Sequence, residues 1–229
     1  ITRNFVRPGQ WLAISLSPTS ATTMEWVLQN LFAHDLAEGT RAGDPFGFIE
    51  REIASIADDP SEIVFLPFLF GSPLSQDASG GFCGVRGWHT RGHLLRAVME
   101  GIAFTHRHHV EQLAAGLPVH TVRLTGGASR SPRWVQLFAD VLALPVEITG
   151  CPEASALGVA QLAGVAAEIY PNLDAAVAAT VRVSGRFEPG PDHARYHAAY
   201  ARYQGLVEAL RPWWVASATP DPDREGKRG

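Results

Sequence analysis

Hydrophobic and polar positions alternate along the chain with two different periods, which predicts a mixture of helices and strands. In some stretches apolar residues recur every three or four positions, and in others they form short β-rich runs. Besides one long helix described below, helices are expected from about residue 21 and over 44–57, 132–141, 154–165 and 191–210, and strands over 10–15, 63–68, 121–125 and 145–149. Alternation of this kind is typical of an α/β fold.

The strongest helical pattern lies just before Leu117 and Pro118, where it ends. One face carries apolar side chains and a histidine, and the opposite face carries charged side chains. The first face comprises Leu95, Val98, Ile102, His109 and Leu113, and the second comprises Arg96, Glu100, Arg107 and Glu111. This division predicts a long helix that is buried along one side.

A strand, a glycine turn and a helix follow one another between residues 121 and 141. The turn is Gly126-Gly127-Ala128, and Ser131 before Pro132 is typical of a helix N-cap with proline at the first helical position. Backbone N–H groups at such a turn can approach a phosphate or ribose closely, and the positive end of the next helix dipole points there. Taken alone, the hexapeptide from Gly126 to Ser131 favours a sharp strand-to-helix connection with no ligand over a ligand-binding turn.

The C-terminal helix has tyrosines at helical intervals, Tyr196, Tyr200 and Tyr203, which we expect to lie in the core. Beyond it the sequence is rich in Pro, Asp, Arg and Gly and has too little apolar content to fold alone. We therefore predict one folded domain over residues 1–212 and a flexible tail over 213–229.

Composition and charge exclude several classes of protein. The chain has 229 residues, 46% hydrophobic and 18% charged, which is enough to bury a full core. A formal charge of -4 without a long basic run argues against nucleic-acid or anionic-membrane binding. Cys83 and Cys151 belong to no Cys-x-x-Cys pair, so the sequence favours a reducing, cytoplasmic setting. No apolar run reaches membrane-spanning length, and the start at Ile1 suggests a fragment.

Three histidines, His106, His108 and His109, stand close together on the long helix. Only the first and third have useful helical spacing, and no set of carboxylates completes a ligand shell. We therefore expect an ordinary half-buried helix face and no metal site.

A glycine-rich segment leads directly into the long helix, and particular residue types stand at fixed spacings along both. Its positions read small-x-aromatic-x-Gly-Val, a gap of seven residues, and then His-Leu-x-x-Ala-Val-Met-Glu. They are filled by Gly80, Phe82, Gly84, Val85, His93, Leu94, Ala97, Val98, Met99 and Glu100. This pattern resembles a signature of the FGGY carbohydrate kinases. The resemblance extends over residues 10–210 and implies the C-terminal lobe of an actin-like (ribonuclease H-like) ATPase fold, a mixed sheet flanked by helices, with the N-terminal lobe absent.

The resemblance also implies where a nucleotide would bind. In these kinases a Gly-Gly-Ala turn in the C-terminal lobe contacts the nucleotide, so Gly126, Gly127, Ala128 and Ser131 are expected to face ATP. The segment 17–26 is similar to the family's helix start beside the nucleotide, which gives Ala21 that place. A capped surface helix explains the same segment equally well. The family's catalytic aspartate and its first phosphate loop match no stretch of this chain, so no catalytic residue is assigned.

The function implied by the resemblance is that of a carbohydrate kinase using ATP and Mg²⁺, with this chain as the nucleotide-binding half. The segments 17–21, 71–72 and 87–91 look most like the L-xylulose kinase branch, and 71–77 lacks the arginine that many members have there. A ketopentose such as xylulose is the expected substrate. Alternatives are another FGGY kinase acting on glycerol, gluconate or ribulose, and a non-catalytic nucleotide-binding module. The expected partner is a small sugar, without nucleic acid or membrane, and the sequence leaves a homodimer open.

Overall fold

The computed structural model describes residues 2–7, 9–16, 20–39, 44–56, 61–72, 77–151 and 153–217. Its strands are β1 (Thr2–Asn4), β2 (Trp11–Ala13), β3 (Val64–Leu66), β4 (Gly81–Cys83), β5 (Val122–Leu124), β6 (Val146–Thr149) and β7 (Val183–Phe187). Its helices are α1 (Ala21–Leu31), α2 (Ala33–Gly39), α3 (Pro45–Ile56), α4 (Arg91–Ala114), the 3₁₀ turn η1 (Gly127–Arg130), α5 (Pro132–Leu142), α6 (Ala154–Ala166), α7 (Leu173–Thr180) and α8 (His193–Ser217). Every helix and strand expected from the sequence is present. Segments 17–19 and 73–76, used in comparing branches of the family, lie outside the described residues.

The strands form three small sheets. The pairs β1–β2 and β3–β4 are antiparallel, and the third sheet has the order β5-β6-β7. In that sheet β5 and β6 run parallel, joined through α5, whereas β6 and β7 are antiparallel. The mixed sheet flanked by helices expected from the sequence is therefore confirmed.

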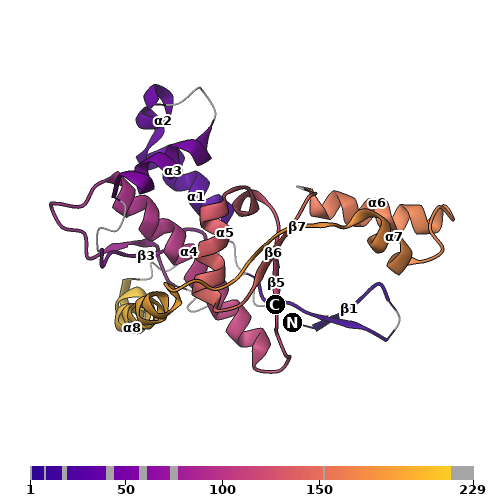
Figure 1. The fold of residues 1–229 in the computed structure, drawn as a ribbon. Helices are drawn as coiled ribbons and strands as arrows, with labels where there is room; N and C mark the ends of the chain where they lie inside the picture. Colours follow the sequence, from indigo (N-terminus) through magenta and orange to yellow (C-terminus); the bar gives the residue numbers. More distant parts are fainter. Residues whose placement is uncertain are drawn as a thin grey trace, which may run out of the picture.

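Helix α4 runs through the centre of the body and packs against α3, α5 and β3 (Figure 1). Leu95, Val98 and Ile102 on its buried face are completely inaccessible to solvent. A β-carbon at Gly101 would collide with the carbonyl group of Phe65 in β3, so glycine lets the helix and the strand approach closely. The face predicted to be buried is the face that forms the core.

Helix α8 extends the folded domain beyond the predicted limit at residue 212. The expected stripe of tyrosines is buried, but the helix continues through Pro212 to Ser217. Trp214 is only 2% exposed, and its ring meets Phe68 edge-on at 5.9 Å between centroids. Residues 213–217 are thus part of the fold because this contact buries a large aromatic side chain, while 218–229 lie outside the described residues.

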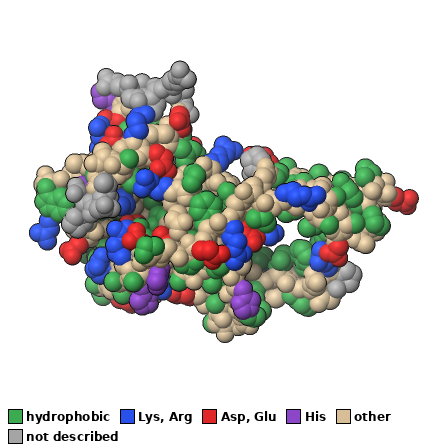
Figure 2. All heavy atoms as spheres, viewed as in Figure 1, with side chains coloured by type: hydrophobic (Ala, Val, Ile, Leu, Met, Phe, Trp, Pro, Cys, Tyr) green, Lys and Arg blue, Asp and Glu red, His purple; other side chains and the backbone are tan. Residues whose placement is uncertain are grey.

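Helices α6 and α7 project away from the body (Figure 1). Hydrophobic side chains lie on the surface of this projection (Figure 2), among them Val159, Leu162 and Ile169, which are exposed. Within the described part of the chain, no helix combines the length and the hydropathy needed to cross a bilayer. The cavity described next lies in the body.

Candidate functional site

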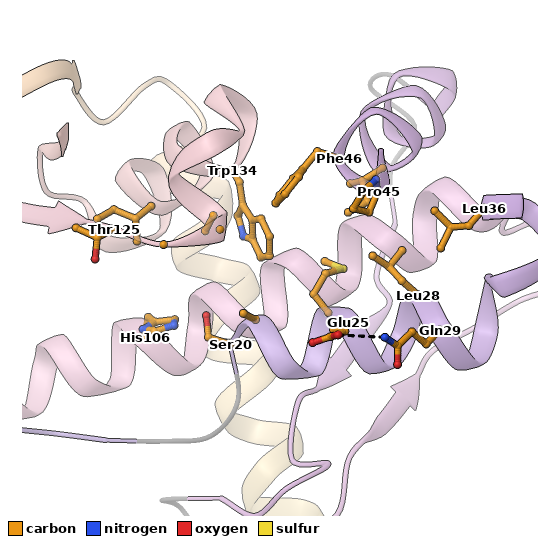
Figure 3. A pocket seen from close by; sticks show the side chains of 17 residues that line it. Ser20, Glu25, Leu28, Gln29, Leu36, Pro45, Phe46, His106, Thr125 and Trp134 are labelled. Atoms are coloured by element: carbon orange, nitrogen blue, oxygen red, sulfur yellow. Dashed lines mark hydrogen bonds between the residues drawn. The ribbon is translucent and has the colours of Figure 1, made fainter. Parts of the chain in front are cut away.

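A cavity of about 530 Å³ opens between the N-terminal helices and the β5–α5 connection. Side chains of α1, α3, α4 and α5 form its walls, and the turn after β5 closes one side (Figure 3). Four of the five residues predicted to bind a nucleotide line it, namely Ala21, Gly126, Gly127 and Ala128. The fold therefore brings together two segments that are about a hundred residues apart in the sequence.

The turn after β5 has a backbone that requires glycine. Gly126 adopts φ +84° and ψ −161°, a conformation that side chains with a β-carbon rarely take. Gly127 begins η1, and a β-carbon there would lie 3.7 Å from the ring of Phe46, in ordinary contact. Ser129 closes the turn, since its N–H and its hydroxyl both donate to the Gly126 carbonyl, at 3.1 and 2.7 Å. The glycines thus keep this wall of the cavity free of side chains.

Ser131, the fifth predicted residue, does not line the cavity. Its side chain is buried and caps α5, accepting a hydrogen bond from the Trp134 N–H at 3.2 Å. Its hydroxyl also donates to Glu50 of α3 at 2.7 Å. The predicted N-cap role is confirmed, and the cap joins the start of α5 to α3 on the border of the cavity.

Ala21 is the first residue of α1, and its small side chain leaves room at the cavity wall. The Ser20 hydroxyl makes no capping hydrogen bond to α1; the Ser20 carbonyl accepts from the N–H groups of Thr23 and Met24. One turn further on, Glu25 accepts a hydrogen bond from Gln29 at 3.1 Å (Figure 3). These two side chains are the polar part of a wall that is otherwise apolar.

Aromatic side chains cover the opposite side of the cavity. Phe46 of α3 and Trp134 of α5 both point into it (Figure 3). Trp134 is 3% exposed, and its indole nitrogen has no hydrogen-bond partner in the described structure. With Pro45 and Leu28, which also line the cavity, these rings make an apolar wall that can accommodate a planar heterocycle.

His106 of α4 lines the cavity, whereas the sequence predicted an ordinary half-buried helix face there and no metal site. Burial, with a smaller contribution in the same direction from the neighbouring His109, lowers the pKa of its imidazole to about 4. The ring is therefore neutral at physiological pH. Among the described residues, no group of three His, Cys, Asp or Glu side chains is arranged to hold a metal ion.

The arrangement suits a ligand with an uncharged planar part and a charged end. The apolar walls favour the planar part, while the glycine turn and the start of α5 offer backbone N–H groups and a positive helix end.

The model for the "FGGY family of carbohydrate kinases, C-terminal domain" matches residues 2–167, which is well over half of the chain. The chain belongs to the FGGY family of carbohydrate kinases.

Similar FGGY proteins include the L-xylulose/3-keto-L-gulonate kinase of Escherichia coli (strain K12), which is 33% identical over 209 residues. That alignment covers 90% of this chain and 40% of the relative. The probable L-xylulose kinase of Pasteurella multocida (strain Pm70) is 31% identical, again over 90% of this chain and 40% of the relative. The chain therefore spans about 40% of the length of these FGGY relatives.

Among solved FGGY structures, the xylulose kinase from Rhodospirillum rubrum superposes with a TM-score of 0.69 and 31% identity. The match covers 85% of this chain and 38% of that chain. The expected fold, the C-terminal lobe of an actin-like sugar kinase, is thereby confirmed.

Proposed function

We propose that this chain is the nucleotide-binding half of an ATP- and magnesium-dependent kinase that phosphorylates a terminal hydroxyl of a ketopentose such as xylulose. Family membership supports the reaction class. The names of the relatives, L-xylulose and xylulose kinases, support a pentulose as the substrate. Glycerol kinases are also similar, at 30% identity for the Rippkaea orientalis protein, so glycerol belongs in the test.

The observation that carries the proposal is the cavity that joins Ala21 to the Gly126–Ala128 turn. A volume of about 530 Å³ with aromatic and aliphatic walls accommodates a nucleoside. The phosphates would leave the cavity past the glycine turn, where no side chain blocks them and backbone N–H groups can approach closely. Gly126, Gly127, Ala128 and Ala21 are the nucleotide-binding residues of this proposal.

In the proposed reaction the sugar hydroxyl oxygen forms a bond to the γ-phosphorus while the bond from that phosphorus to the β,γ-bridging oxygen breaks, releasing ADP. The role of this chain is positioning, since phosphoryl transfer depends mainly on alignment and charge neutralisation. Magnesium would neutralise the charge of the ATP phosphates in this reaction, and no residue of this chain is assigned as its ligand. The hydroxyl proton would pass to a carboxylate of another lobe, as in other general-base reactions.

The test is ADP release by the full-length protein, incubated with Mg-ATP and separately with L-xylulose, D-xylulose, ribulose, glycerol and gluconate. We expect sugar-dependent ADP release that is greatest with one of the pentuloses. Release with glycerol or gluconate alone would overturn the proposed substrate. A folded protein that binds ADP and releases none with any sugar would overturn the kinase reaction and favour a non-catalytic nucleotide-binding module.

A further inference from the structure

The imidazole of His106 occupies an unusual position on α4. Most of that helix face contacts the protein core, but His106 reaches the cavity near Ser20 and Thr125 (Figure 3). Its ring lies against Phe138 of α5 with 5.3 Å between centroids and an interplanar angle of 72°. An edge-to-face contact of this kind fixes the orientation of a ring. The histidine is therefore held in place before any ligand arrives.

His106 has no hydrogen-bond partner among the residues that the structure describes. Two of the other three histidines of α4 do have partners: His93 Nδ1 accepts from the Thr90 N–H at 3.1 Å, and His109 Nδ1 lies 2.6 Å from the Ser15 hydroxyl. The nitrogens of His106 are not completely buried, unlike the unpartnered indole nitrogen of Trp134. They consequently remain accessible from the cavity.

The charge state of His106 defines what it can bind. A neutral imidazole has one N–H donor and one nitrogen acceptor, and it brings no net charge into the cavity. Burial favours this neutral form, which leaves the pKa of the ring far below physiological pH. The apolar surface of Phe46 and Trp134 nearby suits a flat ring. A nucleobase combines such a ring with uncharged donors and acceptors along its edges.

We propose that His106 hydrogen-bonds a polar edge of the nucleobase and is a specificity-determining residue for the nucleotide. This inference rests on the proposed function, because it takes the cavity as the nucleotide site. It adds a base contact from α4 to a site whose other lining residues come from α1, α2, α3, the β5–α5 connection and α5. His106 is a binding residue in this account and takes no part in phosphoryl transfer.

The first experiment measures ADP affinity of the full-length protein by calorimetry. His106→Leu should weaken binding about fivefold to tenfold, as expected for the loss of one hydrogen bond. His106→Gln should recover part of the loss, since its amide also donates and accepts. His108→Gln is the matched control, because His108 lies two residues away on α4 and does not line the cavity; it should bind ADP as the wild type does.

The second experiment separates a base contact from a packing effect. The ligands are 7-deaza-ADP, 3-deaza-ADP and inosine diphosphate, which alter different edges of the purine, and 2′-deoxy-ADP, which alters the ribose. One base analogue should bind the wild type more weakly than ADP does. The affinity of that analogue should not change further when His106 is replaced by Leu. The proposal is overturned if His106→Leu binds ADP normally, if all analogues lose affinity equally, or if only 2′-deoxy-ADP loses its sensitivity. If the wild type binds no ADP, the proposed function fails, and this inference fails with it.

Discussion

At the scale of single residues, the hydroxyl of Ser131 has two candidate roles, contact with ATP and capping of α5. The family resemblance predicts that it faces ATP, whereas in the structure it caps α5 and donates to Glu50. We expect Ser131→Ala to lower the free energy of unfolding by about 1 kcal/mol, the usual cost of losing an N-cap. Urea denaturation measures this loss, and Ser155→Ala, an exposed serine in the first turn of α6, is the control. Weaker ADP binding with unchanged stability would instead place Ser131 on the nucleotide.

Sequence reasoning found the glycine turn because its chemistry is local. Gly126 has a positive φ, and Ser131 with Pro132 marks a helix start, so the short stretch from Gly126 to Pro132 suffices to predict both. His106 could not be placed in the same way. Its contact with Phe138 and its access to the cavity arise from the packing of α4 against α5, which a helical period does not specify.

At the scale of elements, strong periodicity gave reliable predictions, and some short strands were missed. The long apolar face identified α4. In contrast β4 has only three residues, Gly81–Cys83, inside a glycine-rich stretch. It is a strand because it pairs with β3 in the tertiary structure, with Phe65 opposite Phe82. Likewise β7 was missed because only Ser184 and Arg186 mark its polar face and a glycine interrupts the other face, which is a weak strand signal; its pairing with β6 defines it.

The end of α8 provides a test at the same scale. Trp214 is 2% exposed and packs on Phe68, whereas the adjacent Trp213 is 57% exposed. We expect Trp214→Ala to lower the free energy of unfolding by about 3 kcal/mol, because it removes a large buried ring. Trp213→Ala should change it by less than about 0.5 kcal/mol, as is usual for a surface substitution. Equal effects in urea denaturation would show that residues 213–217 do not belong to the folded domain.

At the scale of the whole molecule, Glu100 and His106 make the free energy of unfolding depend on pH in opposite directions. Burial raises the pKa of Glu100 from 4.5 to about 7, against the favourable charges of Arg96, Arg195 and Arg202. The stabilising contribution of Glu100 to the free energy of unfolding is fully present below pH 4.5 and is lost as the pH rises through 7. For His106 the folded pKa is depressed from 6.5 to about 4, so stability is lost as the pH falls through that range. The two slopes therefore offset each other between pH 4.5 and 6.5.

Replacing Glu100 should leave the pH dependence of stability that His106 produces. Glu100→Gln removes the acidic group, so the urea midpoint of the variant should rise relative to that of the wild type as the pH increases from 4.5 to 7. Glu62→Gln, an exposed carboxylate, is the control and should follow the wild type. A constant difference between Glu100→Gln and wild type across this range would show that Glu100 has no raised pKa.

The central claim is that the cavity beside the glycine turn binds the nucleotide, and Gly127→Val tests it most directly. Its backbone has no positive φ and its β-carbon would only touch Phe46, so the fold should persist while the added methyl groups narrow the cavity. Gly116→Val, where the site has open space, is the control. Calorimetry on the full-length protein should show ADP affinity about tenfold lower for Gly127→Val and unchanged for Gly116→Val. Unchanged ADP affinity in folded Gly127→Val would contradict the account.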